Sequence, residues 1–364
     1  MSECIMVGCD LHDRSMLLKM AVGRGKPARR KWSNTIRSRK EMIADLQRRV
    51  EAVGGRRIVF AYEASGSGFV LWDELTAAGI ECYVLAPTRI ERSVRHRRRK
   101  TDDADAEAML NQVRAYVLAG VEMPSVWVPD LQTRDDREVV RTRLDAGDKR
   151  STVKTQIRWV LKRNGIETSM APAPVWTVAY RQWLVDLTSE GLPQGARTAL
   201  RSLLRQLNWL EQEVKVLAAE VCALSDTPRY RSVAAVLCQH KGVGPLTAMT
   251  FLTELGDLSR FANRRQVGSF LGLTPSSQES GEQDDRKGNI THQGPARVRK
   301  VLCQAVWARV ASEPSERLKY EKLVSRNPKH KKIAVVARMR HMAIWMWHAG
   351  LAAQEALRVK ESVA

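Results

Sequence analysis

The chain has 364 residues, enough for two or three domains, and its 60 Lys and Arg against 40 Asp and Glu give a formal net charge of +20. No stretch approaches the roughly 18 apolar residues of a membrane span, and the N-terminus MSECIMVGCD lacks a signal-peptide pattern, so we expect a cytoplasmic protein that contacts no membrane. The basic residues are spread along the whole chain, which favours nucleic acid as the partner. A generally basic soluble protein is the alternative at this level.

The first 130 residues alternate between strand and helix patterns. Apolar runs predict strands at 5–9, 15–22, around 29–32, 57–62 and 82–85, and apolar spacings of three and four predict helices at 41–53, 66–78 and 102–118. The resulting order, βββαβαβα, is that of a ribonuclease-H-like fold, in which helices flank a mixed sheet. We therefore expect an α/β domain over residues 1–130.

The pattern becomes helical from residue 131 onward. Residues 131–163 contain no Pro and a single Gly, and a continuous helix of that length would extend roughly 50 Å. A second run has apolar residues three, four or seven apart between Leu200 and Leu224, which suits an antiparallel two-helix coil. We predict a helical coiled-coil region over 131–228, either a structural or oligomerisation arm or a basic surface for nucleic acid.

Residues 229–364 are predicted to form a third, mainly helical domain. The segment Lys241-Gly242-Val243-Gly244-Pro245 separates two helical patterns. A G-V-G turn of this kind is typical of a helix-hairpin-helix, whose backbone N–H groups face a phosphate, and Lys241 would contact nucleic acid there. An ordinary tight turn between two helices is the alternative interpretation.

Four carboxylates occupy positions that suit a metal centre. Asp10 ends the first predicted strand, Glu63 ends a later central strand, and Asp102 and Asp105 open a predicted helix with a spacing that puts both on one face. Mg²⁺ prefers oxygen ligands, and two such ions can stabilise the attacking and leaving oxygens of a phosphodiester reaction. A salt-bridged strand-end Asp and two helix-capping Asp residues are the structural alternative.

Basic residues directly precede the last two of these acids. They include five that we predict to bind nucleic acid: Arg95, Arg97, Arg98, Arg99 and Lys100. A cationic approach to an acidic pocket suits a nuclease, because the cations hold the phosphate backbone while the pocket holds the metal.

A polar, glycine-containing segment lies in the third region. It reads GLTPSSQESG from Gly272 to Gly281 and continues through Arg286 and G-N-I-T-H-Q-G to Arg297 and Arg299. Small polar and basic residues in one loop suit close approach to a phosphodiester, and we predict nucleic-acid contacts for these three arginines. A flexible surface loop is the alternative.

Together these motifs resemble those of the DEDD transposases of one insertion-sequence family, the bridge-RNA-guided recombinases, to which pilin-gene invertases are also similar. The likeness rests on Asp10, Glu63, K-T-D-D-A-D, G-L-T-P-S-S-x-x-S-G and G-N-I-T-x-x-G, in this order. It covers nearly the whole chain, as a RuvC-like domain, a coiled-coil region and a transposase domain. One departure is Gly294-Pro295, where the family usually has Gly-Asn.

The resemblance implies a composite active site. Asp10, Glu63, Asp102 and Asp105 would hold Mg²⁺ or Mn²⁺, and Ser280 would be the nucleophile that attaches to a DNA strand. Serine at its ordinary pKa is a weak nucleophile and needs activation, which the metal bound by the carboxylates could supply. The carboxylate and serine domains would then have to meet, from one subunit or from two. The implied partners are donor and target DNA, a structured guide RNA and further copies of the chain in a dimer or tetramer.

Three other functions remain open on the sequence. A RuvC-like nuclease or resolvase would use the four carboxylates and have no need of Ser280. A DNA invertase would use the same chemistry as the transposase. A non-catalytic binding protein derived from a transposase is disfavoured, because all four acids are intact.

Overall fold

A computed structural model of the chain describes residues 4–90, 101–277, 287–326 and 328–363. The chain forms two compact units, residues 1–129 and 130–364, which are described separately. The additional boundary at residue 228 stays a prediction. Among the described residues, each helix is either too short or too polar to cross a membrane.

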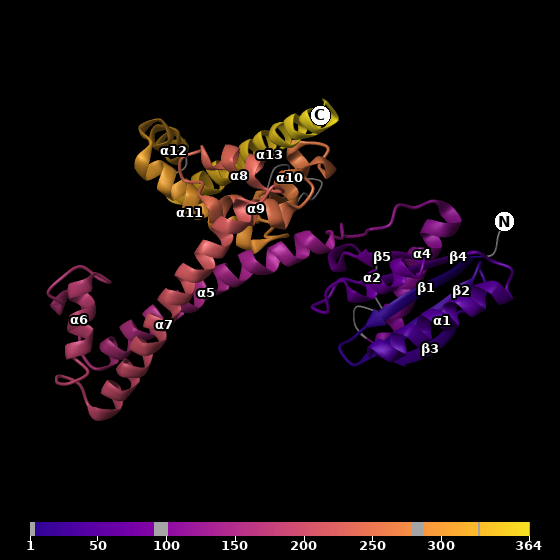
Figure 1. Ribbon diagram of the computed structural model, residues 1–364, viewed down its shortest axis with the longest axis horizontal. Helices are drawn as coiled ribbons and strands as arrows, with labels where there is room; N and C mark the ends of the chain where they lie inside the picture. Colours follow the sequence, from indigo (N-terminus) through magenta and orange to yellow (C-terminus); the bar gives the residue numbers. More distant parts are fainter. Residues whose placement is uncertain (1–3, 91–100, 278–286, 327, 364) are drawn as a thin grey trace. The chain divides into compact units, whose positions relative to one another are not determined.

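The first unit contains a five-stranded mixed sheet (Figure 1). The strands are β1 (Cys4–Leu11), β2 (Ser15–Val22), β3 (Ala28–Ser33), β4 (Arg57–Glu63) and β5 (Glu81–Leu85), in the spatial order β3-β2-β1-β4-β5. The pairs β1–β2 and β2–β3 are antiparallel, whereas β1–β4 and β4–β5 are parallel. The mixed α/β sheet predicted from the sequence is thereby confirmed.

Helices cover both faces of this sheet. On one face, odd-numbered β1 residues such as Val7 pack against α1 (Ile36–Ala52) and α2 (Val70–Ala77). On the other face, Met6 and Val59 pack against α4 (Asp102–Ala119). A short 3-10 turn, η1 (Pro87–Arg89), follows β5. Helix α1 begins five residues earlier than predicted because the Thr35 hydroxyl caps it, accepting from the Ser38 N–H.

The second unit is almost entirely helical. In chain order it contains α5 (Leu131–Arg163), η2 (Thr168–Met170), α6 (Val178–Asp186), α7 (Gln194–Ser225), α8 (Arg231–Cys238), α9 (Pro245–Leu255), η3 (Leu258–Arg260), α10 (Arg264–Phe270), the strands β6 (Pro275–Ser277) and β7 (Lys287–Ile290), α11 (Ala296–Ser312), α12 (Pro314–Arg326), η4 (Pro328–His330) and α13 (Lys331–Val363). The predicted helix over 131–163 coincides with α5, which Asp130 caps through the Thr133 N–H.

Helices α5 and α7 pack along one another as an arm (Figure 1). Near one end of the arm, Ile157 and Leu161 share a buried cluster with Leu200; near the other end, Val140 shares a cluster with Val221. The end of α5 therefore meets the start of α7, and the two helices run antiparallel, as the apolar spacing predicts.

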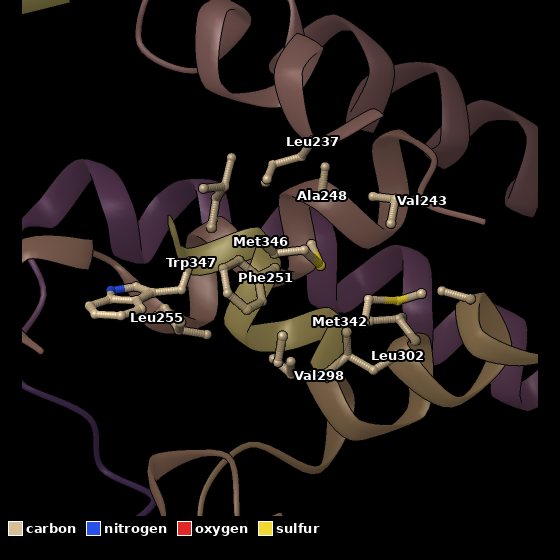
Figure 2. Close-up of a cluster of buried hydrophobic side chains, with 14 of the residues drawn as sticks. Leu237, Val243, Ala248, Phe251, Leu255, Val298, Leu302, Met342, Met346 and Trp347 are labelled. Carbon is tan, nitrogen blue, oxygen red and sulfur yellow. The ribbon is translucent and has the colours of Figure 1, made fainter. Parts of the chain in front are cut away.

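The remaining helices surround a second core. Figure 2 shows side chains of this core, including Leu237 from α8, Phe251 from α9, Leu302 from α11 and Met346 from α13. The first turns of α5 join this core through charge, because Arg141 donates to the buried Glu254 carboxylate at 2.8 Å. The arm and the core are therefore joined by apolar burial and by a buried ion pair.

Candidate active site

The alternation of side chains along β1 and β4 sets the geometry of the acidic site. Successive strand residues point to opposite faces, so Asp10 lies on the same face as Met6 and Gly8, and Glu63 on the same face as Val59. This is the face that α4 covers. Strands β1 and β4 are parallel neighbours, and Cys9 is paired with Tyr62. Asp10 and Glu63 are the next residues of the two strands, so they lie side by side at the carboxyl ends.

Gly8 allows α4 to approach this face closely. A Cβ at Gly8 would lie 2.2 Å from the backbone nitrogen of Leu110 and 2.3 Å from the carbonyl oxygen of Ala106. Backbone therefore packs directly on backbone, and no side chain separates the helix from β1. This contact fixes the depth at which the first turn of α4 lies over the end of the strand.

The first turn of α4 carries the remaining acids. Thr101 caps the helix by accepting from the Ala104 N–H at 3.3 Å. Asp105 is buried, whereas Asp102 is largely exposed. Negative charge is favourable at a helix N-terminus, so this turn tolerates its acids.

Asp103 takes no part in the acidic cluster. Its carboxylate pairs with Lys19 at 2.8 Å and with Arg29 at 3.0 Å, and these two cations lower its pKa. The acids on either side of it therefore differ from it in environment, although all three stand in one four-residue stretch.

His12 was not identified from the sequence, yet it lies within the site. Its Nε2 is 3.1 Å from Oδ2 of Asp10 and 3.4 Å from Oδ1 of Asp102. Asp10, His12 and Asp102 each offer one ligand atom, and these atoms lie within 4.8 Å of one another. The available signal was the position of His12, two residues beyond Asp10 and so on the same side of the extended chain.

The electrostatics of Asp10 favour a cation. Burial raises the pKa of Asp10, the nearby His12 opposes this, and the charges of Asp102 and Asp105 raise the pKa further. Its Oδ2 is buried and has no partner in hydrogen-bond geometry, so the contact with His12 is one of proximity alone. A buried carboxylate oxygen surrounded by like charges and by further donor atoms fits a divalent metal ion.

Several predicted site residues lie outside the described residues. They are Arg95, Arg97, Arg98, Arg99, Lys100, Ser280 and Arg286. Their roles stay predictions. The segment that contains Ser280 and Arg286 connects β6 to β7, which pair as an antiparallel ribbon between α10 and α11.

The other predicted nucleic-acid contacts have protein partners in the structure. Lys241 pairs with Glu313, and Arg297 pairs with Asp145 of α5 at 3.0 Å. Arg299 donates through Nη1 to the carbonyl oxygens of Leu271, Gln293 and Gly294, each at 3.1 Å. Arg299 therefore fastens the start of α11 to the neighbouring loops, and a phosphate would have to share its guanidinium with these three carbonyls.

The glycine turn after α8 connects two helices, as predicted. Gly242 has a φ of +90°, and a Cβ there would lie 2.4 Å from the carbonyl oxygen of Ala305. This glycine is therefore required by close packing on α11. Gly244, in contrast, is the N-cap residue of α9, and a Cβ there would meet nothing within 4 Å. A phosphate contact at this turn stays a prediction.

Comparison with known proteins gives two family matches. Residues 7–165 match a DEDD transposase model, and residues 234–321 match the model described as "Transposase IS116/IS110/IS902 family". The first match contains Asp10, Glu63, Asp102 and Asp105, and the second contains the ribbon that flanks Ser280.

Individual relatives agree with these matches. A Sinorhizobium fredii protein named as transposase y4qE is 31% identical over 72% of this chain and 62% of its own length. The transposase for insertion sequence element IS1533 of Leptospira borgpetersenii is 23% identical over 84% of this chain and 86% of its own length. The pilin gene-inverting protein of Moraxella bovis is 28% identical over 32% of this chain and 36% of its own length. The chain belongs to the IS116/IS110/IS902 family of transposases.

Proposed function

We propose that this protein is an insertion-sequence transposase that cuts and rejoins DNA strands, with a ribonuclease-H-like, RuvC-like catalytic domain in its first unit. The observation that carries the proposal is the placement of Asp10, His12 and Asp102 around one point, in a chain of a transposase family. Glu63, at the end of β4, and Asp105, buried in the first turn of α4, are the other two acids proposed for the site.

The four acids and His12 are the groups that would hold Mg²⁺ or Mn²⁺. A divalent ion bound there would stabilise the attacking and leaving oxygens of the phosphodiester reaction. Within the chain, Asp10 provides a desolvated oxygen, the first turn of α4 carries Asp102 and Asp105, and the Nε2 of His12 lies 3.1 Å from Asp10 and 3.4 Å from Asp102. The nitrogen of His12 favours Mn²⁺, because Mg²⁺ takes oxygen ligands.

Ser280 is the proposed nucleophile. Its hydroxyl oxygen would attack the phosphorus, a phosphorus–oxygen bond of the strand would break, and the sugar would leave as a hydroxyl that takes up a proton. The serine–phosphate ester retains the energy needed for rejoining, whereas hydrolysis would lose it. The carboxylates and the serine can come from different copies of the chain, as expected for a homo-oligomer, either a dimer or a tetramer.

The test of this chemistry is a covalent protein–DNA adduct. We expect wild-type protein to form an adduct with donor DNA that survives denaturation, and Ser280→Ala to form none. Ser276→Ala is the matched control, because the Ser276 hydroxyl already donates to the Asn289 carbonyl at 3.0 Å within the ribbon. The Ser277→Ala variant should likewise retain the adduct.

Peptide mapping of the trapped adduct decides between the candidate functions. An adduct on Ser280 supports strand transfer. Cleavage with no adduct in wild-type protein indicates a RuvC-like nuclease or resolvase instead. A DNA invertase of the same chemistry would give the same adduct, and it is distinguished by its products, because inversion leaves the segment in the same molecule.

We further propose that a structured guide RNA binds this protein. The net charge of +20 supports this, together with α5, on which Lys149, Arg158 and Lys162 are exposed. Two basic residues of α5 are not available to RNA, because they contact α9. Arg137 donates to the Thr253 carbonyl, and Arg141 donates to the Glu254 carboxylate.

RNA affinity is expected to fall steeply with salt, since each neutralised phosphate releases a counterion. Neutralising Lys149, Arg158 and Lys162 together should lower the slope of log affinity against log salt by about 2 if each contacts a phosphate. The measurement is RNA affinity as the salt concentration is raised from low to physiological. The RNA used is the RNA that co-purifies with the protein from cells that carry the whole genetic element. Absence of any discrete RNA from that preparation would count against guidance.

A further inference from the structure

A cavity of about 310 Å³ opens between α11, α12, α13 and the end of α8. We call it the α11–α13 pocket; its polar and aromatic lining residues are His240, Arg309, Glu316, Lys319, Arg338, His341 and Trp345. The volume lies at the lower end of small-molecule sites, which span about 300–1,000 Å³. It has room for one nucleotide unit and none for a duplex.

The pocket carries more positive than negative charge. Glu316, whose side chain is 4% exposed, is paired with Lys319 at 2.9 Å, with Arg309 at 3.6 Å and with Arg338. One carboxylate therefore faces three cations, which leaves two positive charges in surplus. The adjacent pair Lys241–Glu313 is neutral and does not alter this balance.

The two arginines retain hydrogen-bonding capacity. The Nε–H groups of Arg309 and Arg338 are buried, and neither has an acceptor among the described residues. A cluster that served only to join α12 to α13 would be expected to balance its charge. An anionic ligand with several oxygens would balance it and could accept from these arginines.

One wall of the pocket is aromatic. Trp345 is 36% exposed, and its ring centroid lies 4.2 Å from that of His240. Burial lowers the pKa of His240, and the charge of Arg309 lowers it further, so this imidazole is neutral at neutral pH. Burial also lowers the pKa of His341, and the charge of Arg338 lowers it further. Neither histidine therefore adds charge. The two rings are tilted by 45° to one another, so the planar surface beside the cations is that of the Trp345 indole.

We propose that the α11–α13 pocket binds one nucleotide of a single-stranded nucleic acid, with its phosphate against Arg309, Arg338 and Lys319 and its base against Trp345. Base stacking on aromatic rings beside a cationic groove is how single strands are bound without sequence preference. The inference rests on the proposed function, which supplies a nucleic-acid strand, and assigns that strand a contact made by residues other than the carboxylates and Ser280.

The test uses the full-length protein in EDTA, so that strand cleavage does not contribute. Oligonucleotides of about 12 residues, one of thymidine DNA and one of uridine RNA, each carry a 5-iodouracil for cross-linking. We expect cross-links on Trp345, and Trp345→Ala should weaken binding of the favoured oligonucleotide on the order of tenfold. Trp345→Phe keeps a ring in place and should retain most of the affinity.

The cationic part of the pocket is tested with Lys319→Gln. This change leaves Glu316 paired with both arginines, and it should weaken binding while lowering the salt slope by about 0.7. Matched controls are Lys322→Gln on the exposed side of α12 and Trp307→Ala, an exposed indole on α11 outside the pocket. Both controls should bind as wild type does.

Each outcome is decisive. The polymer whose affinity falls in Trp345→Ala identifies the strand as DNA or RNA, and a fall for both supports a contact common to them. Unchanged affinity in Trp345→Ala or cross-links outside the pocket would overturn the proposal. Because no cleavage is measured here, absence of a Ser280 adduct in wild-type protein would refute the proposed chemistry without affecting this result.

Discussion

Asp10→Asn is expected to lower DNA strand cleavage by about a thousandfold and to leave nucleic-acid binding intact. Asp10 supplies the buried, unpartnered oxygen of the proposed metal site, and the loss of a metal's charge from a phosphoryl transition state costs several kcal/mol. About 4 kcal/mol corresponds to the stated factor. Cleavage of labelled donor DNA in Mg²⁺ and in Mn²⁺ provides the measurement, and oligonucleotide binding is followed in parallel.

The matched control is Asp103→Asn. Asp103 lies next to Asp102 in sequence but pairs with Lys19 and Arg29, so its substitution should change cleavage only a few fold. Full activity of Asp10→Asn with EDTA present would refute the metal assignment.

The same substitution has an opposite effect on stability. The pKa of Asp10 is raised in the fold, so protonation favours folding, and this contribution is lost as the pH rises through the folded pKa. Ionised Asp10 therefore destabilises the metal-free protein at neutral pH, and Asn should raise its melting temperature. Added Mn²⁺ should stabilise wild type by about 2.7 kcal/mol at a hundred times its dissociation constant, and Asp10→Asn much less.

Gly8→Val is expected to destabilise the first unit by more than about 4 kcal/mol. The new side chain would enter the space held by the backbone of Ala106 and Leu110, and neither a rotamer change nor a flexible neighbour can relieve that overlap. The helix α4 would have to move off the sheet and carry Asp102 and Asp105 away from Asp10. Chemical denaturation monitored by circular dichroism measures the loss.

Gly66→Ala is the control in the same unit, since a Cβ at Gly66 meets nothing within 4 Å. It should unfold within about 0.5 kcal/mol of wild type. A Gly8→Val protein that unfolds like wild type would show that α4 does not rest on β1 in solution.

The strands and the long helices could be predicted because their signals are local. Alternating burial along β1 and β4 follows from strand geometry, and the sequence predicts the extent of α5 because residues 131–163 contain no Pro and a single Gly. The start of α1 was missed although Thr35 is a favoured capping residue, since the apolar spacing became regular only at Met42.

The partners of charged residues could not be predicted in the same way. Arg297 meets Asp145 and Arg141 meets Glu254 across more than a hundred residues of chain, and neither pairing leaves a pattern in the sequence. A sequence pattern therefore cannot distinguish a basic residue that is available to a phosphate from one that is paired with a carboxylate of the protein. The sequence does not identify His12 for a related reason. A single histidine becomes a candidate metal ligand only when the fold places Asp102 next to it.

The unbroken course of α5 also has a mechanical consequence. Its first turns are held to the helical core by Arg141 and Glu254, its middle by Arg297 and Asp145, and its far end extends into the arm with α7. The part of α5 beyond Asp145 is roughly 27 Å long, and a tilt of about 10° at its base displaces its tip by about 5 Å. A partner bound to the arm near α6 would therefore move further than the core residues whose rearrangement tilts the helix.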